Sequence, residues 1–197
     1  MSEIFFDGIG ERINSIYNDG EKNYKEIKMK ILVAGLDRKV SKEALSDKTQ
    51  FEVVNKIENG NYDVLYIDMI HIGMDEEFEQ LADRIEDGKI KIRKIVFLAT
   101  AGMDKEISPE WLGDGRQVKE LILEVQYVAK LVDETEIPYT ILRPVEVQDE
   151  VQEVEIIAEG EKIVNAKVSK KGLENLIKQA ILTDDYLNQS IGIANKS

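Results

Sequence analysis

The turn after the first apolar run carries part of a phosphate-binding pattern. Residues 31–34 are apolar in succession, as in a parallel strand buried on both faces, and Gly35 follows directly. Glycine lets a backbone approach a phosphate closely, and a dinucleotide-binding turn repeats glycine at fixed spacing. At three-residue spacing the next two positions hold Arg38 and Ser41 instead. Gly35 therefore has two interpretations, a close approach to a phosphate or a tight turn alone.

The charged residues near this turn likewise have a phosphate-binding and a structural interpretation. The guanidinium of Arg38 suits a phosphate and Lys39 adds a second cation, but solvated charges at a helix start are the commoner case. Asp37 is placed to cap that helix. The single histidine, His71, has no evident partner for acid–base catalysis. The acidic stretch 75–79 falls in the first turn of a predicted helix, where carboxylates complement the helix dipole, so we expect no metal site.

These residues must be positioned by alternating strands and helices. Short β-branched runs alternate with helical periodicity, which is typical of an α/β protein. The predicted strands are residues 29–35, 51–54, 63–70, 93–100 and 137–143, and the predicted helices are residues 74–85, 115–135 and 173–181, the last behind an N-cap at Ser169. Residues 145–168 predict a β-hairpin or edge strands. Residues 1–28 predict a leading helix and a polar linker, and residues 29–197 one domain.

Composition excludes several classes of function. The chain has 197 residues, with 26 basic and 39 acidic side chains and a net charge of −13, which argues against binding to nucleic acid. No apolar run approaches the ~18 residues of a membrane span, and we expect neither a secretory signal nor a membrane partner. Cysteine is absent, which excludes thiol chemistry and disulfides. We expect a cytoplasmic protein whose partner is a nucleotide or another small molecule.

Several segments together resemble a known family. Residues 93–103 resemble the fourth-strand segment of atypical short-chain dehydrogenase/reductases. In the second half, Ile-Pro-Tyr-Thr-Ile-Leu-Arg-Pro at 137–144, Glu-Gly-Glu at 159–161, Val-Ser-Lys-Lys at 168–171 and Asn-Gln-Ser-Ile-Gly at 188–192 resemble the NAD(P)H-binding, NmrA-like branch. The resemblance covers roughly residues 29–195. It implies a Rossmann-like, doubly wound, mainly parallel sheet flanked by helices, with NAD or NADP lying across the strand ends.

The resemblance also implies where catalysis would take place. Active members use a Tyr-x-x-x-Lys pair on the helix before the fifth strand, in which tyrosine is the acid–base group and lysine lowers its pKa. Here the helix offers Tyr127 and Lys130, one residue short, which turns the lysine by ~100° from the expected face. Thr100 is the best match to the usual serine. The pattern predicts a degenerate member with these three residues as its catalytic candidates.

The predicted ligand site lies outside the carboxyl ends of the parallel strands, where open α/β sheets bind ligands. Its residues are those that follow the first, third, fourth and fifth strands. They are Gly35, Leu36, Asp37, Arg38, Asp68, Met69, Thr100, Ala101, Gly102, Pro144 and Val145.

Three functions are compatible with these features. The first is a Rossmann-type NAD(P)-binding protein with weak or no catalysis. The second is a non-enzymatic scaffold, sensor or interaction module, which is favoured if the side chain of Leu36, Arg38 or Met69 fills the position of the pyrophosphate. The third is an oxidoreductase with rearranged chemistry, because the cofactor supplies the difficult step of hydride transfer. Two further residues have structural interpretations: Arg143 pairs with a carboxylate at a sheet end, and Trp111 packs against the body.

The helix predicted over residues 115–135 is apolar on two sides. Its broad face suits packing on the sheet, and Leu123, Tyr127 and Leu131 form a second stripe on the other side. This stripe needs a cover, either the N-terminal helix or a second copy of the chain. Members of the family that the chain resembles often pair this helix across a two-fold axis, so we expect a homodimer through residues 115–135.

Overall fold

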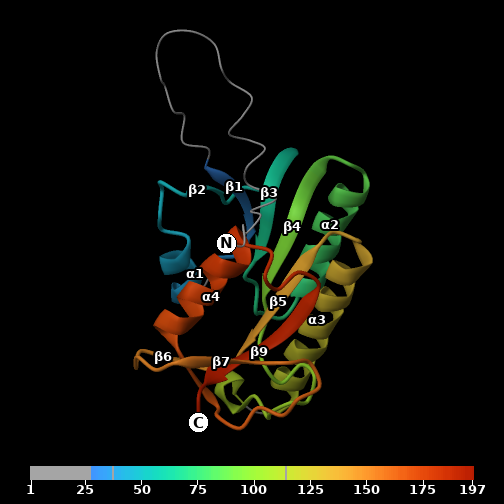
Figure 1. Cartoon of the computed structure of the whole chain (residues 1–197). Coiled ribbons are helices and arrows are strands. Elements are labelled where there is room, and N and C mark those ends of the chain that lie inside the picture. Colours follow the sequence, from blue (N-terminus) through green and yellow to red (C-terminus); the bar gives the residue numbers. More distant parts are fainter. Residues whose placement is uncertain (1–27, 37, 114) are drawn as a thin grey trace, which may run out of the picture.

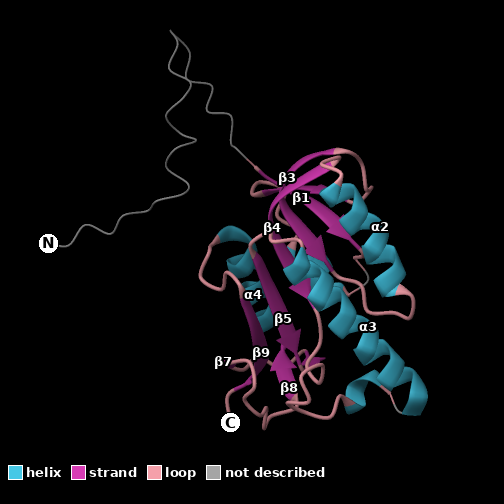
Figure 2. Ribbon diagram, turned by 90° about the vertical axis from the view of Figure 1, so that its right-hand side faces the viewer, coloured by secondary structure: helices cyan, strands magenta, loops and turns pink. Residues whose placement is uncertain are grey.

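A seven-stranded, mostly parallel sheet forms the centre of the protein (Figures 1 and 2). The computed structural model describes residues 28–36, 38–113 and 115–197. In spatial order the strands are β2 (Phe51–Val54), β1 (Met29–Ala34), β3 (Gly60–Ile67), β4 (Ile90–Leu98), β5 (Tyr139–Pro144), β9 (Gln189–Asn195) and β7 (Val154–Ile157). Neighbours pair in parallel except β7, which lies antiparallel to β9 at one edge.

Helices cover both faces of the sheet, as a doubly wound fold requires. On one face α1 (Lys39–Ala44) and α4 (Lys170–Leu182) pack together over a core that includes Val33, Tyr66 and Leu142. On the other face α2 (Met74–Glu86) and α3 (Gly115–Glu134) pack together over a core that includes Leu65 and Phe97. Figure 2 shows α2 and α3 side by side on their face. The predicted Rossmann-like α/β fold is confirmed.

The order of the strands fixes where a ligand site would lie. From β1 the chain runs to β2 on one side of it, whereas β3 lies on the other side. The helices that follow β1 and β3, α1 and α2, accordingly cover opposite faces. Such a reversal opens a crevice outside the carboxyl ends of the two strands. The end of β1 beside the end of β3 is therefore the first place to look for chemistry.

All five strands predicted for the parallel sheet are present, but not all of their bounds are right. β3 and β4 each begin three residues before the predicted start, and they end at Ile67 and Leu98, so that Asp68 and Thr100 lie in the loops beyond them. Strand β9 was not predicted. Ser169 does cap α4, because its hydroxyl accepts a hydrogen bond from the Gly172 amide at 3.3 Å. The helix and linker predicted within residues 1–28 lie outside the described residues, apart from Lys28.

Residues 145–168 form edge strands and no hairpin. β7 is the antiparallel edge strand, while β6 (Glu146–Gln148) and β8 (Lys167–Ser169) pair in parallel as a small separate sheet. The segment after β7 does not return along it because Ile163 is buried and its amide donates to the Glu106 carbonyl at 3.2 Å. The hairpin alternative was therefore wrong, and the edge-strand alternative is confirmed.

Candidate functional site

The ends of β1 and β3 meet through a glycine. Gly35 adopts a φ of +73°, and a Cβ placed there would lie 2.6 Å from the Asp68 carbonyl oxygen and 2.6 Å from Cγ of Met69. The Asp68 amide donates to the Ala34 carbonyl at 2.9 Å, which fixes the two strand ends side by side. Gly35 is thus required by the protein's own backbone. The tight-turn interpretation is sufficient to explain it.

The side chain of Arg38 lies across the strand ends. Its Nε donates to the Asp68 carboxylate, and its two terminal nitrogens donate to the Leu98 carbonyl and, at 2.9 Å, to the Ala99 carbonyl. The Asp68 carboxylate also accepts the Arg38 amide at 3.3 Å and is fully buried, whereas the Arg38 side chain is 25% exposed. The predicted solvated charge was wrong for Arg38, because four acceptor positions meet at its guanidinium and amide. It was right for Lys39, whose side chain is 74% exposed.

The third position of the glycine pattern is also used internally. Ser41 is buried, and its hydroxyl lies 2.8 Å from the hydroxyl of Tyr66 on β3. Burial raises the pKa of Tyr66, and the nearby Asp68 carboxylate adds to that effect, so its phenol stays neutral. Both residues that replace glycine, Arg38 and Ser41, therefore have protein partners on the neighbouring strand ends.

The remaining predicted crevice residues gather at the same end of the sheet. The Ala99 amide donates to the Leu142 carbonyl and the Ala101 amide to the Pro144 carbonyl, each at 2.9 Å, so the exits of β4 and β5 run together. The others are described by burial: Leu36 is half-buried, and Met69, Thr100, Ala101, Gly102, Pro144 and Val145 are buried. Asp37 lies outside the described residues.

Each of the three catalytic candidates interacts with a residue outside the set of three. The Thr100 hydroxyl is buried and donates to the Ala101 carbonyl at 3.2 Å. Tyr127 donates its hydroxyl to the Glu79 carboxylate of α2 at 2.7 Å, and this hydrogen bond raises the pKa of Tyr127. Lys130 pairs with Glu134 at 3.3 Å and its side chain is 64% exposed. An acid–base tyrosine requires a lowered pKa, whereas the pKa of Tyr127 is raised and Lys130 pairs with Glu134.

Gln126 is a residue of the site that was not predicted. It stands four residues before Lys130, which is the spacing at which a family tyrosine would stand. Its side-chain amide donates to the Met103 carbonyl in the loop after β4. Counting back from Lys130, instead of forward from Tyr127, was the signal that would have found it.

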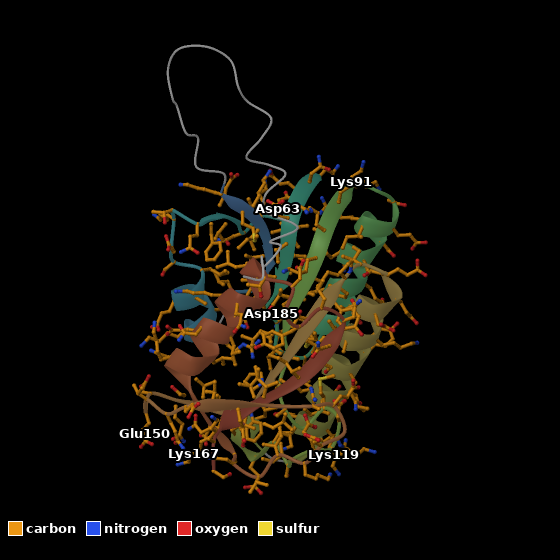
Figure 3. The ribbon with its side chains drawn as sticks, viewed as in Figure 1. Asp63, Lys91, Lys119, Glu150, Lys167 and Asp185 are labelled. Carbon is orange, nitrogen blue, oxygen red and sulfur yellow. The ribbon has the colours of Figure 1, made fainter. Side chains whose placement is uncertain are left out.

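An open cavity of about 590 Å³ lies beside the crevice. The loop after β4 forms one wall, through Gly102, Met103 and Pro109, and the first half of α3 forms the other, through Ile122 and Gln126 among others. Most of its lining is apolar. Lys119, which also lines it, is labelled in Figure 3 near the start of α3, at the opposite end of the molecule from Asp63 and Lys91. The apolar walls of the cavity suit the face of a ring, and Lys105 and Lys119 add positive charge to the lining.

A family model described as NAD(P)H-binding matches residues 38–184. The chain belongs to this NAD(P)H-binding family. The match begins at Arg38, so the strand β1 and Gly35 precede it. The resemblance to the NAD(P)H-binding branch is thereby confirmed.

Solved structures of low sequence identity share the fold. A short-chain dehydrogenase/reductase from Veillonella parvula in complex with NADP has a TM-score of 0.69 and 14% identity, over 87% of this chain and 96% of that chain. A Rossmann-fold NAD(P)-binding family protein from Shigella flexneri has a TM-score of 0.66 and 16% identity, over 87% and 95%. An oxidoreductase from Lactococcus lactis has a TM-score of 0.61 and 16% identity, over 86% and 92%. No protein of curated function matches the chain in sequence.

Arg143, at the end of β5, stabilises the loop after β4. Arg143 is buried and pairs with Glu106, which is also buried, and with Asp104 at 2.8 Å. It also donates to the Ser190 carbonyl at 3.3 Å. Burial raises the pKa of Asp104, although the Arg143 charge opposes this. The predicted pairing of Arg143 with a carboxylate is confirmed, as is the packing of Trp111 against the core.

The described part of the chain, residues 28–36, 38–113 and 115–197, offers neither a metal-ligand cluster nor a helix that could span a bilayer. There, no group of three or more His, Asp or Glu side chains could hold a metal ion. His71 lies 3.0 Å from Glu77 at the start of α2. Among the same residues, no helix combines the length and apolar character that crossing a bilayer requires.

Replacement of Gly35 by alanine tests how closely the strand ends approach. We expect Gly35→Ala to lower the free energy of unfolding by about 2–4 kcal/mol, because it adds backbone strain and a clash with the Asp68 carbonyl. The matched control is Gly88→Ala, since Gly88 has a φ of +68° and no atom within 4 Å of the added Cβ. Strain alone predicts a loss of about 1–2 kcal/mol there. Equal losses in urea unfolding would mean that close packing at Gly35 contributes nothing.

Replacement of Arg143 tests the buried pair. We expect Arg143→Met to cost about 3–5 kcal/mol, because Glu106 would remain buried without its counter-charge. The double variant Arg143→Met with Glu106→Met should recover much of that loss, since it removes both charges. Urea unfolding of the two variants measures the difference. A double variant no more stable than the single one would contradict this role of Glu106.

Proposed function

We propose that the chain is an NAD(P)-binding Rossmann protein of the oxidoreductase-like type in which catalysis is weak or absent. The observation that carries this proposal is the bonding of Tyr127 to Glu79 on α2. A bound nicotinamide would supply the hydride, so the protein's task would be to orient the substrate and move a proton. The proton donor that the family uses is directed elsewhere in this chain.

The candidate residues support this division between binding and catalysis. Thr100 is buried and its hydroxyl is already bonded to a carbonyl. Gln126 stands at the four-residue spacing before Lys130, and a neutral amide cannot donate a proton as a phenol does. These contacts favour an inactive or slow enzyme.

The crevice fits the phosphates of a dinucleotide only in part. Arg38 provides a cation at the strand ends, which suits a phosphate. Gly35 is the one glycine kept from the pattern, and its position is packed against Asp68 and Met69. The helix α1 has six residues, too few for a strong dipole at its start. We therefore propose weak binding, with the predicted crevice residues as the contacts.

The alternative is an interaction module that kept the fold and lost cofactor binding. The position of Arg38, which spans the ends of β3 and β4, favours this alternative. A scaffold or sensor of this kind would need no acid–base pair, because fold alone does not imply catalysis.

Titration with NADH and NADPH distinguishes the two functions. We expect both cofactors to bind weakly and saturably. Cofactor fluorescence and calorimetry measure this binding. With a panel of quinones and aldehydes, NADPH should be consumed no faster than without protein. Tyr127→Phe should leave binding unchanged, because the Tyr127 hydroxyl is bonded to Glu79 on α2. No binding at cofactor concentrations up to about 1 mM would favour the interaction module. A dissociation constant of that size corresponds to a binding free energy of about −4 kcal/mol.

We also propose a homodimer through α3, the helix predicted over residues 115–135. Leu123 is 64% exposed and Tyr127 39% exposed, while Leu131 is half-buried against the core that α2 and α3 share. Only the first half of the predicted stripe therefore needs a cover. A small apolar patch of this kind can complement itself across a two-fold axis.

Substitution on this patch tests the dimer. We expect the native chain to scatter light as a dimer and Leu123→Glu to scatter as a monomer. The control is Val151→Glu, since Val151 is 87% exposed in the loop before β7. A native monomer at micromolar concentrations would show that the stripe is covered from within the chain or is simply exposed.

A further inference from the structure

The ion pair between Arg38 and Asp68 lies at the reversal of strand order. Asp68 follows β3, the Arg38 side chain reaches it from the turn after β1, and the carboxylate is fully buried. A charged pair is seldom placed here without a purpose, because burial of a carboxylate is costly unless a partner compensates it.

The two partners differ in their freedom to move. Asp68 is fixed by its amide, which donates to Ala34 at 2.9 Å, and by the contact of its carbonyl with Gly35. Arg38 carries its charge on a long side chain that is 25% exposed. Its other contacts are two backbone carbonyls, of Leu98 and Ala99, which remain in place if it leaves. Arg38 is therefore the partner that can exchange.

A carboxylate and a phosphate present the same pattern of oxygen acceptors to a guanidinium fork. Asp68 already accepts from the Nε of Arg38 at the strand ends, where a dinucleotide would place its phosphates. We propose that Asp68 is an internal competitor for ligand phosphate. The ligand's phosphate binds Arg38 only by displacing it from Asp68, so the crevice admits phosphorylated nucleotides and gives no such advantage to nucleosides.

This inference rests on the proposed NAD(P) binding. It adds that Asp68 weakens this binding by competing for Arg38. The exchange predicts the direction in which each substitution changes the affinity for phosphate. Weakening the internal competitor must tighten phosphate binding, because Arg38 becomes available. Removing Arg38 must weaken it, because the exchangeable cation is lost. If Arg38 only blocked the crevice, its removal would instead tighten binding.

Calorimetric titrations with NADPH, NADH and adenosine test the direction of these changes in affinity. We expect Asp68→Asn to bind both dinucleotides on the order of tenfold tighter than the native chain, and Arg38→Met on the order of tenfold more weakly, within the usual range of coupling between two sites. Adenosine binding should be the same in all variants. Asp68→Ser serves as a second competitor-free variant, and circular dichroism verifies that each variant is folded.

The matched control is an Arg–Asp pair at the other end of the sheet. Arg93 lies 3.5 Å from Asp63 and its side chain is 64% exposed, and Figure 3 labels Asp63 at that end. Arg93→Met removes the same charge far from the crevice and should leave dinucleotide binding within about twofold, since exposed charges contribute little at physiological salt.

The outcomes separate the two proposals. Tighter binding in Asp68→Asn together with weaker binding in Arg38→Met supports the exchange. Tighter binding in Arg38→Met would overturn it in favour of a simple plug. Equal binding by the native chain and both variants would overturn the exchange and leave the NAD(P)-binding proposal intact. No binding by any folded variant would overturn both.

Discussion

The meeting of the ends of β1 and β3 is the constraint on which the site depends. The Gly35 backbone lies against the Asp68 carbonyl, and the Asp68 amide is bonded to β1. This close approach buries the Asp68 carboxylate, and a buried carboxylate requires a cation. Arg38 is the side chain that provides it, and its remaining donors then satisfy carbonyls at the end of β4. One backbone contact thus determines the charge, the partner and the shape of the crevice.

Much of the fold could be predicted because it depends on local periodicity. The apolar runs of β1, β4 and β5 and the helical faces of α2, α3 and α4 are visible in sequence, and the structure has all of them. Strand β9 was missed because Ser190, Gly192 and Ala194 interrupt its β-branched pattern. The hairpin was wrong because Ile163 is buried through a contact with a loop more than fifty residues earlier. Local alternation carries no information about such a contact.

The chemistry of the site was predictable to a smaller extent, for the same physical reason. A sequence shows that Arg38 begins a helix, which favours a solvated charge, but its partners lie thirty and sixty residues further on. The role of Arg143 could be predicted because few alternatives exist for a cation within an apolar strand. Tyr127 is an intermediate case: its exposed side was visible, whereas its bond to Glu79 depends on how α2 and α3 pack. In all three cases the partner lies thirty or more residues away along the chain, and its identity could not be predicted from local sequence.

The affinity of the crevice for an anion depends on the net charge of the chain, on screening by salt and on the charged groups at the crevice itself. The whole chain carries a net charge of −13, which disfavours the approach of an anionic nucleotide. At physiological salt that field is screened beyond ~8 Å, so affinity is decided by the groups that line the crevice. There the Arg38 cation is neutralised by Asp68, and the six-residue helix α1 offers little dipole to replace it. A phosphate must therefore compete with a fixed internal carboxylate for the guanidinium of Arg38. The family fold is kept, and on the proposed exchange the affinity of the crevice for anions would depend on the stability of a single ion pair.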